Sequence, residues 1–183
     1  MGSEVYLYNV NQMKSPDVNL WMCFPSIYSF SLSSLGYLWI CKGFDERNDV
    51  FVERVCSDTD KTHLRPNEVD IMAFSFSFDL DFLNIFKMLE KYNIPLKSED
   101  RDEKYPLIMV GGPVVTANPM PYSKFFDVCF IGDGEGLNSK VVDIYKENQG
   151  KSKDEILKAL SEIEGVFVPK YKKDVKKSTV KLD

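Results

Sequence analysis

The chain has 183 residues, of which 44% are hydrophobic and 28% are charged, a balance typical of one globular domain that argues against wholesale disorder. Its formal charge of −5 disfavours nucleic-acid binding by this chain alone, because no basic excess is present to neutralise a phosphate backbone. No apolar run approaches the ~20 residues that span a bilayer, and the amino terminus shows no secretion signal. We therefore expect a cytoplasmic location and no membrane partner.

The four cysteines point to buried, reduced thiols. Cys23, Cys41, Cys56 and Cys129 form no CxxC pair, and the first and last of them lie inside apolar runs that are typical of strands. A disulfide framework or a metal site is therefore not expected, in keeping with a cytoplasmic chain.

The first predicted elements are a strand over residues 20–24 and a helix after it. Leu32, Leu35, Gly36 and Trp39 are spaced i, i+3, i+4 and i+7, the period of one helix face. This face is expected to be buried, with Gly36 allowing the helix to lie close to a sheet.

The middle of the chain repeats this alternation. An edge strand is predicted over residues 50–55 and a buried strand over 69–74. Asp79 or Asp81 is expected to cap the next helix, whose apolar positions are again spaced at i, i+3, i+4 and i+7: Phe82, Ile85, Phe86 and Leu89.

An aromatic run accompanies the second of these strands. In an extended segment, Phe74, Phe76 and Phe78 would place three rings on one face. Core packing is the favoured interpretation, and a wall beneath a flat ligand is the alternative.

Two apolar runs that each enter a glycine turn organise the second half of the chain. They cover residues 107–110 and 128–131, a pattern typical of an open parallel sheet. A helix is then predicted from near Gly134, another after the capping-box spacing at Ser152, and a short last strand over residues 166–169.

The sum of these elements predicts an α/β fold, specifically a three-layer α/β/α sandwich with a Rossmann-like or flavodoxin-like, mostly parallel sheet. The strand order 2-1-3-4-5 is the economical guess. Residues 1–18 are expected to be an N-terminal extension, whose Met1-Gly2-Ser3 start resembles an expression scar, and residues 19–169 to be the domain. Residues 170–183 hold six lysines against two aspartates, which is typical of a solvated linker or an arm lying on an acidic surface.

In such a fold the loops that follow the buried strands open at one edge of the sheet, where small residues let backbone N–H groups reach a ligand. No catalytic or metal-binding residue is predicted. The candidate ligand-binding residues come from three of these loops: Ser75, Ser77, Gly111, Gly112, Pro113, Gly132, Asp133, Gly134 and Glu135. Glycine turns without any ligand are the alternative interpretation.

The two glycine loops differ in charge. An acid about 4 Å from a phosphate costs roughly 1 kcal/mol in water and about 4 kcal/mol at an effective dielectric near 20. Asp133 and Glu135 are therefore expected to accept hydrogen bonds from hydroxyls, amides or a partner's arginine, whereas the neutral loop 111–113 suits close approach by a nucleotide or phosphate. Neither loop has the spacing of a Walker or dinucleotide-binding motif. The chain's single histidine, His63, is expected to be an ordinary surface residue.

Several stretches together resemble a known family. The segments FPSIYSFSLSSLG, VERVCSDTD, IMAFSFSFDLDFLNIFKMLEKYNIPL, YPLIMVGGPVVTANP and IGDGEG, ending in IEGVFVPKY, are similar to the N-terminal, cobalamin-binding-like domain of radical SAM iron–sulfur proteins. The resemblance implies a Rossmann-like fold and a second, catalytic domain whose CxxxCxxC motif holds a [4Fe–4S] cluster and S-adenosylmethionine. This chain has no such motif, so the resemblance implies an accessory domain that is not catalytic alone and whose partner is the radical SAM domain of the same parent chain.

Cobalamin is the cofactor that the resemblance raises for this domain. Related cobalamin-binding domains carry DxHxxG after the first strand, a serine motif after the third and GG after the fourth. Ser75, Ser77 and Gly111-Gly112 match the latter two places, but no histidine matches the first. We therefore expect either cobalamin without a histidine ligand from this chain, or part of a substrate.

Two alternatives stay open. One is a docking module without a small ligand, in which Asp133 and Glu135 contact the catalytic domain and the Lys-rich tail, residues 170–183, is the linker toward that missing radical SAM domain. The other is a free-standing, flavodoxin-type nucleotide-binding protein.

Overall fold

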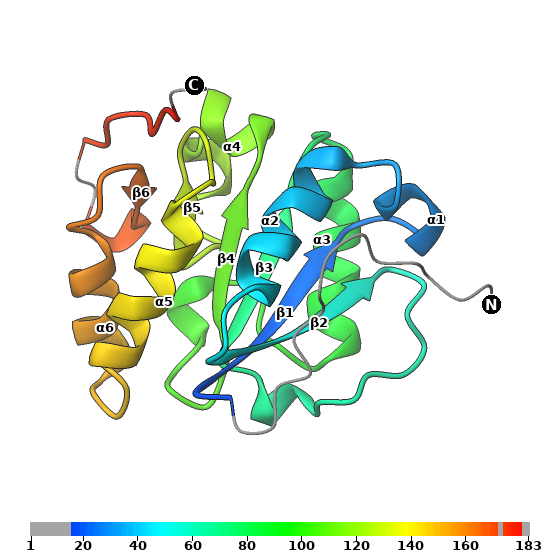
Figure 1. The fold of residues 1–183 in the computed structure, drawn as a ribbon, viewed down its shortest axis with the longest axis horizontal. Helices are drawn as coiled ribbons and strands as arrows, with labels where there is room; N and C mark the ends of the chain where they lie inside the picture. The colour runs from blue at the N-terminus through cyan, green and yellow to red at the C-terminus, as the bar shows by residue number, and fades with distance from the viewer. Residues whose placement is uncertain (1–15, 172–173, 181–183) are drawn as a thin grey trace.

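The structure, a computed structural model, describes residues 16–171 and 174–180. Residues 1–15, which include Met1-Gly2-Ser3 and most of the expected N-terminal extension, lie outside that part. Six strands form one sheet (Figure 1): β1 Val18–Phe24, β2 Val50–Cys56, β3 Ile71–Ser75, β4 Leu107–Gly111, β5 Val128–Phe130 and β6 Val166–Phe167. The α-helices are α1 Tyr28–Ser31, α2 Leu35–Asp45, α3 Asp81–Lys91, α4 Pro113–Ala117, α5 Leu137–Glu147 and α6 Lys153–Leu160. Short 3₁₀ turns are η1 Pro66–Glu68, η2 Ser98–Asp100, η3 Met120–Tyr122 and η4 Pro169–Tyr171.

The strand order is β2-β1-β3-β4-β5-β6. The first five strands are parallel and follow the predicted order 2-1-3-4-5, whereas β6 adds an antiparallel edge beside β5. The predicted α/β fold class is therefore confirmed, and the sixth strand extends the predicted sheet. The sheet starts at Val18, two residues before the predicted strand and within the expected N-terminal extension.

Helices cover both faces of the sheet because side chains along each strand alternate between two cores. In β1, Leu20, Met22 and Phe24 enter the core beneath α2, α5 and α6. Trp21 and Cys23 enter the opposite core, beneath α3 and α4. The three-layer sandwich expected from the sequence is the result.

The buried face of α2 differs from the predicted one. Leu35 and Trp39 are 76% and 52% exposed, and nothing lies within 4 Å of a Cβ built on Gly36. The helix instead buries Tyr37, Cys41 and Phe44, which have the same i, i+4, i+7 spacing. The prediction for Leu32, Leu35, Gly36 and Trp39 is therefore wrong, because α2 carries two apolar stripes and only one of them packs on the sheet.

Two expectations around β3 are also corrected. Phe74 and Phe76 are buried, but the strand ends at Ser75 and Phe78 is 72% exposed, so three rings do not share a face. Helix α3 has Leu80 at its N-cap and no side-chain cap. Asp79 instead accepts a hydrogen bond from the Tyr122 hydroxyl at 2.8 Å.

Other local predictions are confirmed. Ser152 and Glu155 form a reciprocal capping box at the start of α6. β2 lies at the sheet edge. All four cysteines are free and buried.

A buried ion cluster fixes the amino edge of β4 and β5. The Asp127 carboxylate lies 3.2 Å from Arg101 Nη2 and 3.0 Å from Lys153 Nζ, and it accepts hydrogen bonds from the Ile108 amide at 2.8 Å and from the Ser98 hydroxyl. The side chains of Arg101 and Asp127 are fully inaccessible, and burial lowers the pKa of Lys153. Two cations share this one carboxylate, so its loss would leave buried charge without compensation.

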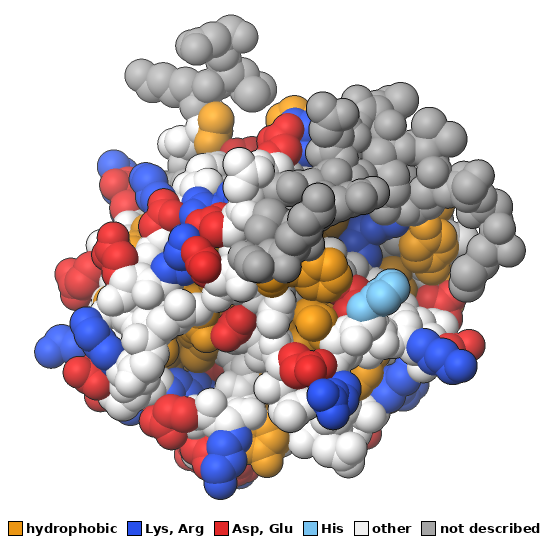
Figure 2. Space-filling view, turned by 60° about the horizontal axis from the view of Figure 1, so that its bottom comes forward, with side chains coloured by type: hydrophobic (Ala, Val, Ile, Leu, Met, Phe, Trp, Pro, Cys, Tyr) orange, Lys and Arg blue, Asp and Glu red, His pale blue; other side chains and the backbone are white. Residues whose placement is uncertain are grey.

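The surface that Figure 2 shows carries Lys and Arg interspersed with Asp and Glu, with hydrophobic side chains between them. The described side chains on this face therefore alternate in charge and do not line up as an extended cationic stripe of the kind that follows a nucleic-acid backbone. Among the described residues, no helix is long and apolar enough to cross a membrane.

Candidate functional site

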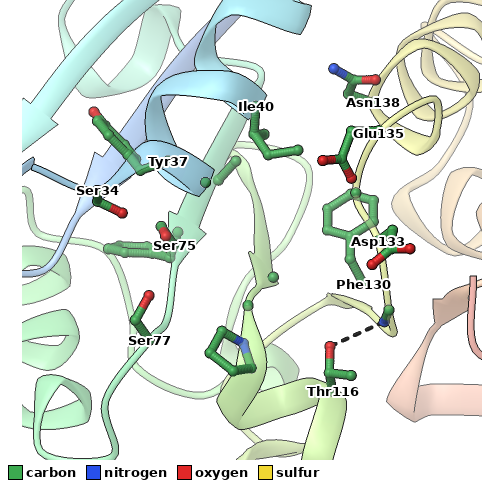
Figure 3. Close-up of a pocket in the computed structure, with 18 of the residues that line it drawn as sticks. Ser34, Tyr37, Ile40, Ser75, Ser77, Thr116, Phe130, Asp133, Glu135 and Asn138 are labelled. Carbon is green, nitrogen blue, oxygen red and sulfur yellow. Dashed lines mark hydrogen bonds between the residues drawn. The ribbon is translucent and has the colours of Figure 1, made fainter. Parts of the chain in front are cut away.

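A pocket of about 490 Å³ opens at the carboxyl edge of the sheet, on the face covered by α2 and α5. It lies where the loops after β3, β4 and β5 come together, as expected for an open parallel sheet. Figure 3 shows Tyr37 and Ile40 of α2 on one side of it and Glu135 and Asn138 on the other, with Ser75 and Ser77 on the Tyr37 side, at and after the end of β3. A preformed cleft of this size suits a small-molecule ligand.

The floor and one wall of the pocket are apolar. Met22 of β1, Ala73 of β3 and Phe130 of β5 belong to the core on the side of α2 and α5, and α2 adds Ile40 and Phe44 to the lining. An apolar floor suits the flat or aliphatic part of a ligand.

One polar group in this wall has a structural partner. Tyr37 donates its hydroxyl hydrogen to the Met22 carbonyl at 3.0 Å, and burial raises the pKa of this tyrosine. Tyr37 thus stays neutral and ties α2 to β1.

All nine residues predicted from the sequence line this pocket. The structure brings together the ends of three strands that are far apart in the sequence: Ser75, Ser77, Gly111, Gly112, Pro113, Gly132, Asp133, Gly134 and Glu135. Their location is as expected, and their role in ligand binding stays a prediction.

Helices and the chain end contribute further lining residues that were not predicted from the sequence. These are Ser34, Gly36, Tyr37, Ile40, Phe44, Thr116, Asn138 and Lys177. The lining residues of α2 could have been predicted if Tyr37, Cys41 and Phe44 had been taken as the buried face of this helix. Gly36 and Ile40, next to that face, then lie towards the carboxyl edge of the sheet. No sequence signal indicated Lys177.

Gly112, in the loop after β4, is required by close packing against Phe76. Gly112 has φ +121°, and a Cβ there would lie 2.5 Å from the Phe76 carbonyl oxygen. The Phe76 amide also donates to the Gly111 carbonyl at 2.8 Å, which joins the loops after β3 and β4. Close approach of two backbones therefore accounts for Gly112 without a ligand.

The loop after β5 is held from two sides. The Gly132 amide donates to the Thr116 hydroxyl at 3.0 Å, the contact drawn in Figure 3. On the other side, the Asp133 amide donates to the Ser178 carbonyl at 3.0 Å, and the Asp133 carboxylate accepts from the Val180 amide at 2.9 Å. Asp133 thus contacts the Lys-rich tail of its own chain, where a solvated linker was expected.

His63 lies apart from this pocket. Its side chain is 89% exposed, and its Nδ1 lies 3.1 Å from Glu53 Oε1, on the edge strand β2. It is absent from the described lining residues, so the pocket contains no imidazole from this part of the chain. Likewise, no group of three or more His, Cys, Asp or Glu residues in the described ranges is arranged to hold a metal ion.

Comparison with known proteins adds the following. The family model described as "Radical SAM proteins, N-terminal" matches residues 36–169. A solved structure of the cobalamin-dependent S-adenosylmethionine radical enzyme OxsB, with aqua-cobalamin and S-adenosylmethionine bound, is similar in fold, with a TM-score of 0.53 and 14% sequence identity. The similarity covers 84% of this chain and 20% of OxsB, so the chain spans about a fifth of that enzyme's length. No curated protein matches the chain. Because the family match extends over most of the sequence, this chain belongs to the N-terminal domain family of radical SAM proteins.

Proposed function

We propose that this chain is an accessory domain of a radical SAM enzyme and that it holds cobalamin, or part of the substrate, in the pocket between α2 and α5. The observation that carries the proposal is the preformed pocket itself, which combines an apolar floor with small residues at the carboxyl edge of the sheet. The domain has no catalytic residue of its own in this proposal. The family match favours this function over that of a free-standing flavodoxin-type protein.

The described residues fit cobalamin in part. The apolar surfaces of Met22, Ile40 and Phe130 suit a flat or aliphatic group, and the hydroxyls of Ser75 and Ser77 can donate to polar groups at its margin. No histidine is positioned to ligate cobalt, so a corrinoid would bind here without an imidazole from the described part of this chain.

The chemistry is divided between two domains in this proposal. Cobalamin, when bound, supplies the cobalt chemistry. The [4Fe–4S] cluster and S-adenosylmethionine belong to the radical SAM domain of the same parent chain. The residues described here would orient the ligand and exclude water from its apolar side.

Titration of the chain with aquacobalamin, followed by its visible spectrum and by equilibrium dialysis, tests the cofactor. We expect saturable binding of one equivalent. A spectrum that stays unchanged while dialysis shows one equivalent bound would fit a corrinoid held without a new cobalt ligand. Absence of retention at saturating aquacobalamin would contradict the cofactor assignment.

A second function, docking of the radical SAM domain, is favoured by exposed apolar side chains around the same edge. Leu35 and Leu80 are 76% and 83% exposed, in the segments that follow β1 and β3. The other exposed large hydrophobic side chains of the described ranges lie in the same segments, in the first half of α2 and of α3, after α4 or in the tail: Ile27, Phe30, Leu32, Trp39, Phe78, Leu83, Met120 and Val180. Apolar side chains that gather beside a pocket mouth are typical of an interaction surface.

The occupant we propose for this surface is the radical SAM domain, because it would lie over the pocket and close it. Burying a leucine contributes about 1.5–3 kcal/mol. The double variant Leu35→Ser, Leu80→Ser should therefore weaken binding of the separately produced radical SAM domain by tenfold or more. Lys104→Ser, at an 86% exposed position before β4, is the control and should leave binding unchanged. Equal binding by both variants would contradict docking at this edge.

The cytoplasm remains our proposed location. Four buried free thiols fit a reducing compartment.

A further inference from the structure

The carboxyl-terminal residues 174–180, named the strap here, pair with the loop after β5. The Ser178 amide donates to the Ile131 carbonyl at 2.9 Å, and the Ser178 carbonyl accepts from the Asp133 amide at 3.0 Å. Gly132 and Ser178 thereby form a parallel bridge. The strap is thus joined to the domain by a short stretch of sheet pairing.

The body of the domain is shaped to receive the strap. A Cβ on Gly132, which has φ +102°, would lie 2.1 Å from the Ser178 carbonyl oxygen. A Cβ on Gly165, with φ +86°, would lie 2.7 Å from Ser178 Cβ. Two glycines from different loops therefore leave room for the same strap residue.

Side chains alternate along the strap as they do along a strand. Lys176 extends to Glu164, with 3.4 Å between Nζ and Oε1. Lys177 lines the pocket instead, and its Cγ would lie 2.8 Å from a Cβ on Gly132. The pairing therefore directs one lysine away from the pocket and its neighbour along the pocket wall.

Lys177 is the one cationic side chain among the described residues that line the pocket. Two carboxylates, Asp133 and Glu135, line the same wall, and one oxygen of Asp133 already accepts the Val180 amide. An ammonium at this wall offsets the repulsion that the acids alone would exert on an anionic group. The single ammonium offsets one of the two carboxylate charges, so an anionic group would have to bind on the Lys177 side of this wall, away from Glu135.

We propose that the strap is a fixed part of the ligand site and that Lys177 binds an anionic group, specifically a phosphate, of the ligand. The proposal rests on the pocket assigned above as the ligand site. It does not require that the ligand be cobalamin, because the nucleotide loop of cobalamin and other phosphate-bearing ligands present the same chemistry.

Titration of the isotope-labelled chain with inorganic phosphate at constant ionic strength tests this proposal, with the amide resonances of Gly132 and Asp133 as the readout. We expect saturable shifts in the wild type. Loss of a charge-assisted hydrogen bond in Lys177→Gln should weaken phosphate binding about tenfold. Lys176→Gln removes the same charge one residue away and should change the affinity less than about twofold.

A second variant releases the strap but keeps its lysine. Ser178→Pro removes the amide that donates to Ile131, so the Asp133 amide should lose protection from hydrogen exchange and phosphate should bind as weakly as to Lys177→Gln. The proposal is overturned by phosphate shifts that do not saturate in the wild type, by equal loss in the two lysine variants, or by full affinity in Ser178→Pro.

Two corrinoids then distinguish this inference from the proposed cofactor. Cobinamide lacks the nucleotide loop and its phosphate, so Lys177→Gln should weaken aquacobalamin binding and leave cobinamide binding unchanged. If phosphate binds as predicted and neither corrinoid binds to the wild type, the cofactor assignment fails and the phosphate belongs to another ligand. If aquacobalamin and inorganic phosphate both bind equally to the wild type and Lys177→Gln, cobalamin binding by the domain stands and the role of Lys177 is refuted.

Discussion

The Asp133 carboxylate accepts a hydrogen bond from the Val180 amide at 2.9 Å, which places an acid of the glycine loop against the chain's own tail. The sequence suggested that Asp133 would face a ligand or a missing domain. One oxygen of Asp133 is bound by the strap. Glu135 is the acid of this loop that stays exposed beside the pocket. The polar wall of the site is thus built from two chain segments about 40 residues apart.

Substitution of Gly112 should be costly. In Gly112→Ala, the positive φ and the 2.5 Å approach to the Phe76 carbonyl oxygen should lower the free energy of unfolding by about 1–3 kcal/mol. Urea denaturation measures the change. Gly36→Ala is the matched control, because open space surrounds its Cβ in the first turn of α2, and it should leave stability unchanged or raise it by less than about 1 kcal/mol. Equal effects of the two substitutions would contradict the backbone contact at Phe76.

The buried ion cluster should be sensitive to loss of its single carboxylate. Asp127→Asn leaves Arg101 and Lys153 without the opposite charge that lies 3.2 Å and 3.0 Å away, and should cost about 3–5 kcal/mol of stability. Glu99→Gln breaks an exposed pair with Lys97 and should change stability by less than about 0.5 kcal/mol. Chemical denaturation measures the free energy of unfolding of both variants. A decrease below about 1 kcal/mol for Asp127→Asn would show that the fold does not depend on the cluster.

Stability should fall in acid partly through Asp49. Hydrogen bonds from Arg47, and then from Lys146, hold the pKa of Asp49 well below its ordinary value. A carboxyl group whose pKa is lower in the folded than in the unfolded chain stabilises the fold at any pH above its unfolded pKa, which is about 3.9 for aspartate. That stability is lost as the pH falls from about 3.9 towards the folded pKa. Urea denaturation from pH 7 to pH 3 should therefore show a smaller decline for Asp49→Asn than for the wild type. Identical pH profiles would contradict this linkage.

The cysteines should be unreactive in the folded chain. Burial raises the pKa of Cys129 to about 12 and also raises that of Cys23, so little thiolate forms near pH 8. A chromogenic disulfide reagent should modify none of the four thiols quickly under native conditions and all four after unfolding. Rapid reaction of one equivalent with the folded chain would show that a cysteine is accessible.

The fold and the glycine loops could be predicted because buried parallel strands are continuous apolar runs and small residues follow each of them. The buried face of α2 could not. The stripe of Leu35 and Trp39 and the stripe of Tyr37, Cys41 and Phe44 have equivalent helical spacing, so periodicity does not choose between them.

The other part that escaped prediction is the strap. Its composition is that of a solvated tail, and its contacts depend on backbone hydrogen bonds that any residue except proline can make. Gly132 and Gly165 leave room for Ser178 because they have no side chain, and this fit is seen only in the folded arrangement of the loops. Long-range backbone pairing of this kind leaves little trace in local sequence patterns.

The pocket between α2 and α5 is proposed to hold the ligand, and a substitution that fills this pocket tests the proposal most directly. A Cβ on Gly36 meets open space and the residue lines the pocket, so Gly36→Trp should fill the pocket mouth without disturbing the core, whereas Gly36→Ala should leave it open. Aquacobalamin titration of the wild type and both variants, with unfolding curves to confirm that each is folded, is the measurement. We predict binding to the wild type and to Gly36→Ala and at least tenfold weaker binding to Gly36→Trp. Equal binding by Gly36→Trp, or no binding by the wild type, would contradict cobalamin binding in this pocket.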